Sequence, residues 1–426
     1  MTDLRPKLAV LAALQSQPDF SALDSFPVLG GSAGRGFLQW MDRSGLALTF
    51  FRQLQNHAAT GRVSHSWQAA FCQRLTANAA RTRDMLAEAQ RINALFTSFE
   101  VTAVTLKGIT LSPDFCDDLT LRHQVDFDFL VDRSQVHRAA DAIRSCGYLA
   151  ASVNESGETS FLTPLTHIPS HNDDLYAVQR QRQVDLHTSL WEPCPWLPLD
   201  VPQDCLDFVR PQTIAGTSYL SLSLEDKFLL QVLHAFRHSF RSWIRLSWLL
   251  EISKCLDNHR YDGALWDRVI RRAGDTRLSK SIFAFVLGLV TRLFATQIPT
   301  TLHDWSADGR TRPLCAWLDH FALNWALSDW PGSLNNLFLA AEFISDPVLR
   351  TQYWRGRLFP GKAQTYLGLV AAHGTMNFLR LQVARASYVA HRAAVHLKDI
   401  AALPVQQFRW KRALESCRRP EFSDNC

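Results

Sequence analysis

The sequence has no apolar run long enough to cross a bilayer, since its longest, Ile282 to Val290, is far too short. It also lacks a recognisable secretory signal, because Gln15 and Gln17 interrupt the short apolar run near the N-terminus and no clear cleavage site follows. Charge of one sign is not in large excess, since the net charge of the 426 residues is only +5. These absences predict a protein without a membrane span and do not demand a nucleic-acid partner.

Nine cysteines are scattered along the chain, but none forms a Cys-x-x-Cys pair. Their number is odd and several lie in apolar runs, so we expect reduced thiols in a cytoplasmic protein. A zinc-peptidase motif is missing as well. His234 and His238 are four residues apart, but the residues between them, Ala-Phe-Arg, include no glutamate. Structural or substrate-side histidines are favoured over a zinc site.

The sequence does contain an acidic pair inside an apolar run, Val125 to Val131, whose β-branched and aromatic residues predict a strand. Because side chains alternate along a strand, Asp126 and Asp128 face one side, whereas Phe127 and Phe129 face the other. Two carboxylates held together in such a strand repel each other and lose hydration, so a cation must offset their charge. A divalent metal such as magnesium, which prefers carboxylate oxygens, is the expected cation.

A turn suited to anions lies upstream of this strand. Val101 to Leu106 predicts another short strand, which runs directly into Lys107 and Gly108. A glycine just past a strand lets backbone amides approach an anion, and Lys107 adds a mobile positive charge. Arg122 adds a planar guanidinium that matches phosphate.

A second acidic strand is expected downstream, at Gln183 to His187, where polar and apolar residues alternate again. Asp185 and His187 share one face of it. If this strand pairs beside the first, Asp185 meets Asp126 and Asp128. Three converging carboxylates are the ligand set for two metal ions that grip a nucleoside triphosphate during in-line displacement.

Each of these features also has a plainer interpretation. The Asp-x-Asp strand could be a solvent-facing edge with only its phenylalanines buried. Lys107 could be a solvated strand end, Arg122 a surface or salt-bridge arginine, and His187 a structural hydrogen-bonding residue. The order of the three elements along the chain favours the metal site.

With these motifs the chain resembles the uncharacterised nucleotidyltransferase family of the polymerase-β-like superfamily, and it is similar to the nucleotidyltransferase toxins of abortive-infection systems. The segments that carry the resemblance are Leu106-Lys107-Gly108, Arg122, Asp126 to Val131 and Val184 to His187. The resemblance implies that Asp126 and Asp128 hold two magnesium ions, and that Asp185 binds one of them and helps to activate the acceptor hydroxyl. It implies that Lys107 and Gly108 lie by the triphosphate. Arg122 is a further candidate for nucleotide binding, and His187 is a candidate accessory residue.

The sequence departs from the family pattern near the turn and on a later helix. Pro113, soon after Gly108, predicts a late helix start with Ser112 as N-cap and Pro113 in the first helical position. The family tends to carry an Asp on a later helix, at the place where this chain has Glu251. No role is assigned to Glu251 from the sequence.

The pattern as a whole predicts an α/β nucleotidyltransferase core, a small mixed sheet with flanking helices, joined to mainly α-helical N-terminal and C-terminal regions. We expect a helical region at residues 1–100, the core at residues 101–190 and a helical region at residues 191–426. Residues 191–220 are rich in proline and are expected to form a connector, and a capping box at Ser223 begins the next helix.

The expected function is magnesium-dependent transfer of a nucleoside monophosphate from an NTP to a hydroxyl group, with release of pyrophosphate. The acceptor could be a protein, a small molecule or an RNA. The alternative is a catalytically inactive nucleotidyltransferase fold that binds a nucleotide or a partner. The C-terminal end is basic from Arg380 to Arg419, and we favour a solvated helix face there over a patch for RNA or another anionic partner.

Overall fold

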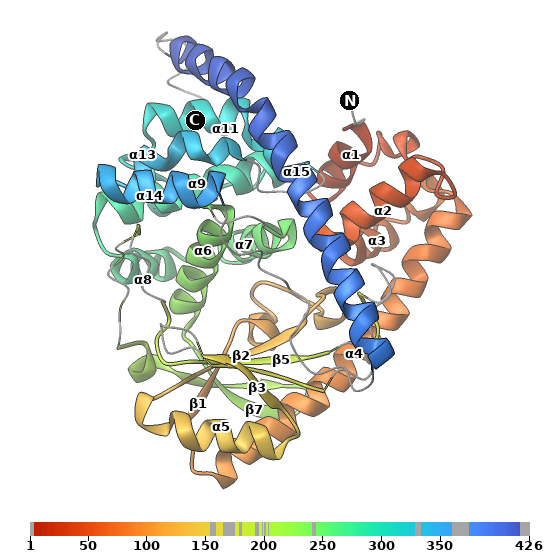
Figure 1. Ribbon diagram of the computed structural model, residues 1–426. Helices are drawn as coiled ribbons and strands as arrows, with labels where there is room; N and C mark the ends of the chain where they lie inside the picture. The colour runs from red at the N-terminus through yellow and green to blue at the C-terminus, as the bar shows by residue number, and fades with distance from the viewer. Residues whose placement is uncertain are drawn as a thin grey trace.

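The computed structural model of the chain describes residues 4–153, 159–164, 175–178, 181–191, 196–197, 199, 202, 204–240, 244–328, 334–359 and 375–417. Figure 1 shows that a twisted sheet lies between helices on its two faces, with further helices from both ends of the chain gathered on one side. This arrangement of a mixed sheet, flanking helices and helical end regions confirms the predicted fold class.

Seven strands form one sheet in the described part of the chain. They are β1 (Ala103–Leu106), β2 (Asp126–Val131), β3 (Leu149–Val153), β4 (Thr159–Leu162), β5 (Gln183–His187), β6 (Arg210–Ile214) and β7 (Thr217–Ser221). Their order across the sheet is β3-β4-β5-β2-β1-β7-β6. The pairs β2–β5 and β1–β7 are parallel, and the other neighbouring pairs are antiparallel. The two strands predicted to carry carboxylates are therefore direct neighbours.

One face of the sheet is apolar, as the alternation in β2 predicts. Phe127 and Phe129 are almost fully buried and belong to a cluster with Phe96 of α4 (His65–Ser98) and with residues of α5 (Val136–Ser145). Figure 1 shows α4 and α5 beneath the sheet. The two phenylalanines of β2 thus point to this side, and its aspartates point to the opposite face.

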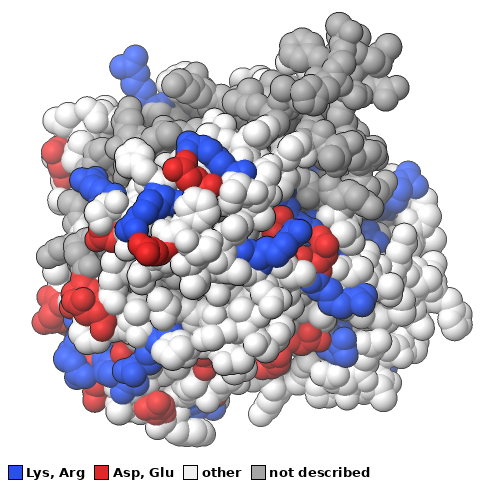
Figure 2. All heavy atoms as spheres, turned by 90° about the horizontal axis from the view of Figure 1, so that it is seen from below, with Lys and Arg blue, Asp and Glu red and all other residues white. Residues whose placement is uncertain are grey.

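Charged residues of both signs are interspersed on the outer side of this lower layer, as Figure 2 shows. On α5, Arg144 pairs with Asp141, and Arg138 pairs with Glu100 across to the end of α4. This is an ordinary solvated surface rather than a field of one sign.

Helices from the two ends of the chain share one core. The N-terminal helices before α4 are α1 (Arg5–Ala13), α2 (Ser32–Ser44) and α3 (Ala47–Asn56). The C-terminal helices are α6 (Leu224–Phe240), α7 (Leu246–Asn258), α8 (Gly263–Ala273), α9 (Arg277–Phe294), α10 (Thr300–Ala307), α11 (Arg312–His320), α12 (Ala322–Ala326), α13 (Ala340–Phe343), α14 (Pro347–Leu358) and α15 (Thr375–Ser416). One hydrophobic cluster contains Trp40 and Phe50 from the first group and Phe236 and Phe285 from the second.

The longest apolar run of the sequence, Ile282 to Val290, lies within α9, and most of its side chains are buried in this core. Among the described residues, no helix combines the length and the apolar character needed to cross a membrane.

The interpretation of residues 191–220 as a connector is wrong for its last part, where β6 and β7 form a hairpin that adds to the sheet. The turn uses Ala215 and Gly216, both with positive φ, as tight hairpins require. The physical reason for the error is that β6 is an edge strand. An edge tolerates Pro211 and polar side chains that resemble loop composition.

The expectation of a helix that begins at Pro113 is also wrong. Gly108–Leu111 forms a 3₁₀ turn directly after β1, and Ser112 and Pro113 lie in irregular turns that follow it. Phe115, two residues further on, is fully buried. Burial of this segment against the helical core overrides the local signal for a helix start.

Candidate active site

Three carboxylates from two strands share the polar face of the sheet. Asp126 and Asp128 lie on β2, and Asp185 lies on β5 directly opposite Asp128 in the parallel register. Each side chain reaches this face because it alternates with buried apolar residues such as Phe127 and Leu186. The structure therefore brings together the three acidic residues predicted from the sequence.

Asp128 has two basic neighbours. His187 Nε2 lies 2.9 Å and Lys107 Nζ 3.8 Å from the same carboxylate oxygen, and each of the three side chains is less than one-fifth exposed. Burial by itself would raise the pKa of Asp128, but the charge of Lys107 and the hydrogen bond and charge of His187 outweigh burial and hold the pKa at about 2. Asp128 is therefore an anion throughout the physiological pH range.

Asp126 behaves in the opposite way. Burial, followed by repulsion from Asp128 and Asp185, raises the pKa of Asp126 to about 7, against the smaller opposing effects of Lys107 and Arg122. The three carboxylates thus have too little positive charge around them to be ionised together at low cost. A divalent cation would remove this deficit, so the donor set and its charge fit magnesium.

Asp185 is buried and accepts hydrogen bonds from two neighbours. Ser160 Oγ on β4 donates to Oδ1 at 2.6 Å, and Gln183 Nε2 donates to both carboxylate oxygens at 2.9 and 2.8 Å. Neither donor is among the residues predicted from the sequence. Gln183 could have been found because it precedes Asp185 by two residues on the same strand face, whereas Ser160 lies on a strand without a clear local signal.

As the side chains stand, no group of three or more His, Cys, Asp and Glu residues in the described part of the chain is arranged to hold a metal ion. The carboxylate oxygens contact other side chains of the protein instead. Lys107 and His187 pair with Asp128. Ser160 and Gln183 donate hydrogen bonds to Asp185. Binding a cation here would mean exchanging some of these contacts. The site has the ligand chemistry for magnesium but would have to rearrange its side chains to coordinate it.

The turn after β1 carries Lys107 to the carboxylates. Lys107 and Gly108 both have positive φ, at 49° and 53°. The positive φ favours glycine at position 108, and a Cβ there would come within 2.4 Å of the side-chain amide nitrogen of Gln124 and displace that side chain. Thr110 Oγ1 donates to the Lys107 carbonyl at 2.8 Å and closes the turn. Lys107 is therefore held beside Asp128 and is not a solvated strand end.

Arg122 lies in the loop before β2, and its guanidinium has a carboxylate partner. Its Nε lies 2.9 Å from Glu251 Oε1 of α7, and Gln231 of α6 donates to the other Glu251 oxygen at 3.0 Å. Arg122 thus has the salt-bridge contact that its plainer interpretation predicted, although its charge still acts on Asp126. The loop itself is anchored from α4, where Arg81 donates to the carbonyl of Gln124.

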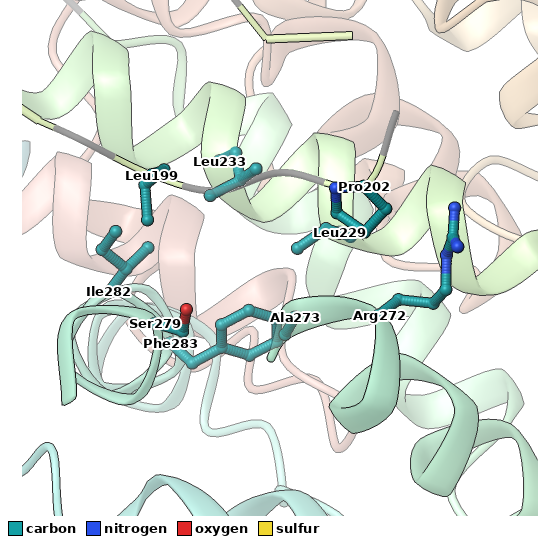
Figure 3. A pocket seen from close by; sticks show the side chains of 9 residues that line it. All are labelled: Leu199, Pro202, Leu229, Leu233, Arg272, Ala273, Ser279, Ile282 and Phe283. Carbon is teal, nitrogen blue, oxygen red and sulfur yellow. The ribbon is translucent and has the colours of Figure 1, made fainter. Parts of the chain in front are cut away.

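Two cavities lie away from these residues. A small cavity of about 10 Å³ lies between α6, α8, α9 and the side chains of Leu199 and Pro202 (Figure 3). A groove of about 330 Å³ lies between the segment after the 3₁₀ turn and the β6–β7 hairpin. None of the predicted site residues lines either one. The first has room for about one water molecule, so neither its size nor its lining marks a ligand site.

The residues just described lie inside the segment that a family model recognises. The model for a family described as uncharacterised nucleotidyltransferase matches residues 34–295, more than half of the chain. The chain belongs to this uncharacterised nucleotidyltransferase family. The match confirms the resemblance seen in the motifs and includes the whole sheet, α6 and α7. It also includes α3, α8 and α9.

No curated protein and no solved structure matches the chain. Membership of the nucleotidyltransferase family supports nucleotidyl transfer as the class of activity and a nucleotide as substrate.

Proposed function

We propose that the protein is a metal-dependent nucleotidyltransferase that transfers a nucleoside monophosphate from an NTP to a hydroxyl acceptor. The observation that carries the proposal is the meeting of Asp126, Asp128 and Asp185 on one face of the sheet, beside the Lys107–Gly108 turn. The family match supports the class of reaction.

In this proposal Asp126, Asp128 and Asp185 hold magnesium, with two ions expected. When bound, the ions would neutralise charge that develops on the transferred phosphate and lower the pKa of the acceptor hydroxyl. His187 orients Asp128, and Ser160 and Gln183 orient Asp185 through the hydrogen bonds described above.

Lys107 and Gly108 bind the triphosphate end of the substrate. Lys107 Nζ offers three donors within reach of the carboxylates, and the left-handed turn at Gly108 brings the backbone close without a Cβ in the way. The acceptor oxygen then bonds to the α-phosphorus as the bond to the bridging oxygen breaks. Pyrophosphate leaves, and the acceptor proton passes to a base or to water.

The test is NTP consumption with magnesium by the wild type and by Asp128→Asn. We expect at least about a hundredfold loss of turnover in the variant, because one ligand charge is removed while the shape is kept. Asp132→Asn is the matched control, since Asp132 is exposed and caps a turn just past the same strand. Equal turnover by wild type and Asp128→Asn would discard the mechanism.

A reducing compartment, the cytoplasm, is part of the proposal. Cys116, Cys205 and Cys255 carry free thiols, and burial raises the pKa of the Cys116 and Cys205 thiols to about 12 and about 11. Such thiols are inert at neutral pH and are typical of core positions rather than of a disulfide framework.

A further inference from the structure

The polar face of the sheet is partly covered by α6. Leu230 of α6 packs in a small cluster with Val104, Leu106 and Leu130, which lie on the same face as the aspartates. Figure 1 shows α6 and α7 on the side of the sheet opposite α5. Helix α6 therefore contacts the sheet next to the carboxylates.

The same helix is tied to the site by a buried polar contact. Glu251 of α7 accepts from Gln231 of α6 and from Arg122, the arginine that precedes β2. Gln231 and Glu251 are both buried. These bonds hold one turn of α6 and one turn of α7 next to the site, so the residues one turn further along each helix also lie near it.

Three rings pack edge to face or at a tilt on that next turn. His234 follows Gln231 by three residues, and Trp248 precedes Glu251 by three. The ring centroids of His234 lie 4.4 Å from His238 and 4.5 Å from Trp248, and those of His238 and Trp248 lie 4.7 Å apart. All three residues are only partly buried, unlike the aromatic residues of the main core. We call this set the ring cluster.

The ring cluster lies within electrostatic reach of the site. Burial comes first among the causes that lower the pKa of His234 well below its ordinary value, and the charges of Lys107, His238, Arg122 and His187 add to it. His234 is therefore neutral at physiological pH. A neutral imidazole packed edge to face against an indole offers an uncharged aromatic surface, which suits a ring system rather than a phosphate.

We infer that the ring cluster of His234, His238 and Trp248 is the stacking platform for the nucleobase of the NTP. This inference rests on the proposed function. A nucleotide joins a π-face to a polyanion, and the protein offers a cluster of aromatic rings near the Lys107 ammonium. Base stacking on aromatic side chains tolerates any base because each has a π-face. The platform accepts all four bases and favours the larger purines.

The experiment measures two binding constants by calorimetry, with the full chain and magnesium. One ligand is a purine NTP analogue with a methylene bridge between the α- and β-phosphates, and the other is inorganic tripolyphosphate, which has no base. We expect Trp248→Ala to weaken analogue binding about tenfold and to leave tripolyphosphate binding within about twofold of wild type. Trp248→Phe retains most of the analogue affinity because it keeps an aromatic face.

Trp305→Ala is the matched control. Trp305 is also partly buried and packs against another ring, Phe283, but it lies on α10. It should bind both ligands as wild type does. Wild-type affinity for the analogue in both Trp248→Ala and His234→Ala overturns the inference and leaves the proposed function standing. An equal loss of both ligands in Trp248→Ala also overturns it, because that loss means a structural role. Failure of the wild type to bind either ligand overturns the proposed function, and the inference falls with it.

Discussion

Asp126 and Asp128 are two residues apart on one strand, yet the pKa of Asp126 is raised and the pKa of Asp128 is lowered from the ordinary value. Asp128 faces Lys107 and His187, whereas Asp126 lies among carboxylates with weaker compensation. The difference comes from which neighbours each side chain meets and not from residue type. The charge deficit of the site is therefore concentrated at Asp126, which makes this residue the most sensitive reporter of a bound cation.

This deficit predicts a pH dependence of stability in metal-free protein. A carboxyl whose pKa is raised on folding binds its proton more tightly in the native state. Its contribution favours folding at low pH and is lost as the pH rises from the unfolded value near 3.8 to about 7. Asp126→Asn should therefore raise the free energy of unfolding at pH 8 by about 1–2 kcal/mol in the presence of a chelator, with a smaller gain at pH 5.

Thermal or urea unfolding at the two pH values measures this gain, and Asp132→Asn serves again as the exposed control. A variant that is less stable than wild type at pH 8 would mean that Asp126 is not under net repulsion.

Gly108 gives a second prediction at the residue scale. Gly108→Ala should lower the free energy of unfolding by about 1–2 kcal/mol, because alanine is strained at a φ of 53° and its Cβ would meet the Gln124 side chain. Gly36→Ala is the control, since Gly36 lies inside α2 with open space around it and should gain about 0.5–1 kcal/mol. Urea titration measures both changes, and equal effects of the two substitutions would contradict the strained turn.

At the scale of elements, the salt bridge between Arg122 and Glu251 joins the loop before β2 to α7. Both side chains are mostly buried, with 14% and 8% exposed, so solvent screens the pair little. Gln231 adds α6 to the same contact. The helices that cover the site are thus fastened to the loop that leads into the acidic strand.

Removing one partner of this salt bridge should lower the free energy of unfolding more than removing both partners. Glu251→Met leaves Arg122 as a buried charge without its carboxylate partner and should lower the free energy of unfolding by about 3 kcal/mol, and Arg122→Met is the other single substitution. The double substitution Arg122→Met with Glu251→Met removes both charges and should cost less than the sum of the two single substitutions. Denaturant titration of the four proteins gives the coupling energy, and strict additivity would show that the two residues do not act as a pair.

At the scale of the whole molecule, the first and last helices of the chain pack on the shared helical core. Lys7 of α1 donates to the carbonyl of Leu327 at 2.7 Å, so the first helix contacts a segment more than 300 residues away. At the other end, the Trp410 ring of α15 stacks on Phe338, with centroids 5.6 Å apart. Residues 4–33 and the described residues after 295 lie outside the match, and many of them belong to the same hydrophobic core as the matched helices.

The contribution of α15 packing to stability can be tested at Trp410. Trp410→Ala should lower the free energy of unfolding by about 1–3 kcal/mol, because it removes a ring packed against Phe338 and Phe321. Phe408→Ala, two residues earlier on the same helix and 62% exposed, should change it by less than about 0.5 kcal/mol. Equal values from urea titration would mean that this end of α15 does not pack on the core.

That the basic C-terminal segment is a solvated helix face stays a prediction. Lys398, Arg409 and Lys411 are exposed on α15, in accord with that interpretation, and Arg418 and Arg419 lie outside the described residues. The domain boundaries at residues 100 and 190 also stay predictions, although the sheet takes in β6 and β7 beyond residue 190.

The sequence alone was enough to place Asp126 and Asp128 on one face, because alternation along a strand is a local property of the backbone. It was also enough to predict an α/β core with helical ends. Only the tertiary structure decided that Asp185 lies opposite Asp128, that Ser160 binds Asp185, and that Arg122 pairs with a residue 129 positions away. Strand pairing and ion pairing join segments distant in the chain. Local periodicity carries no information about which distant segment arrives, since that choice is made by burial of the whole core.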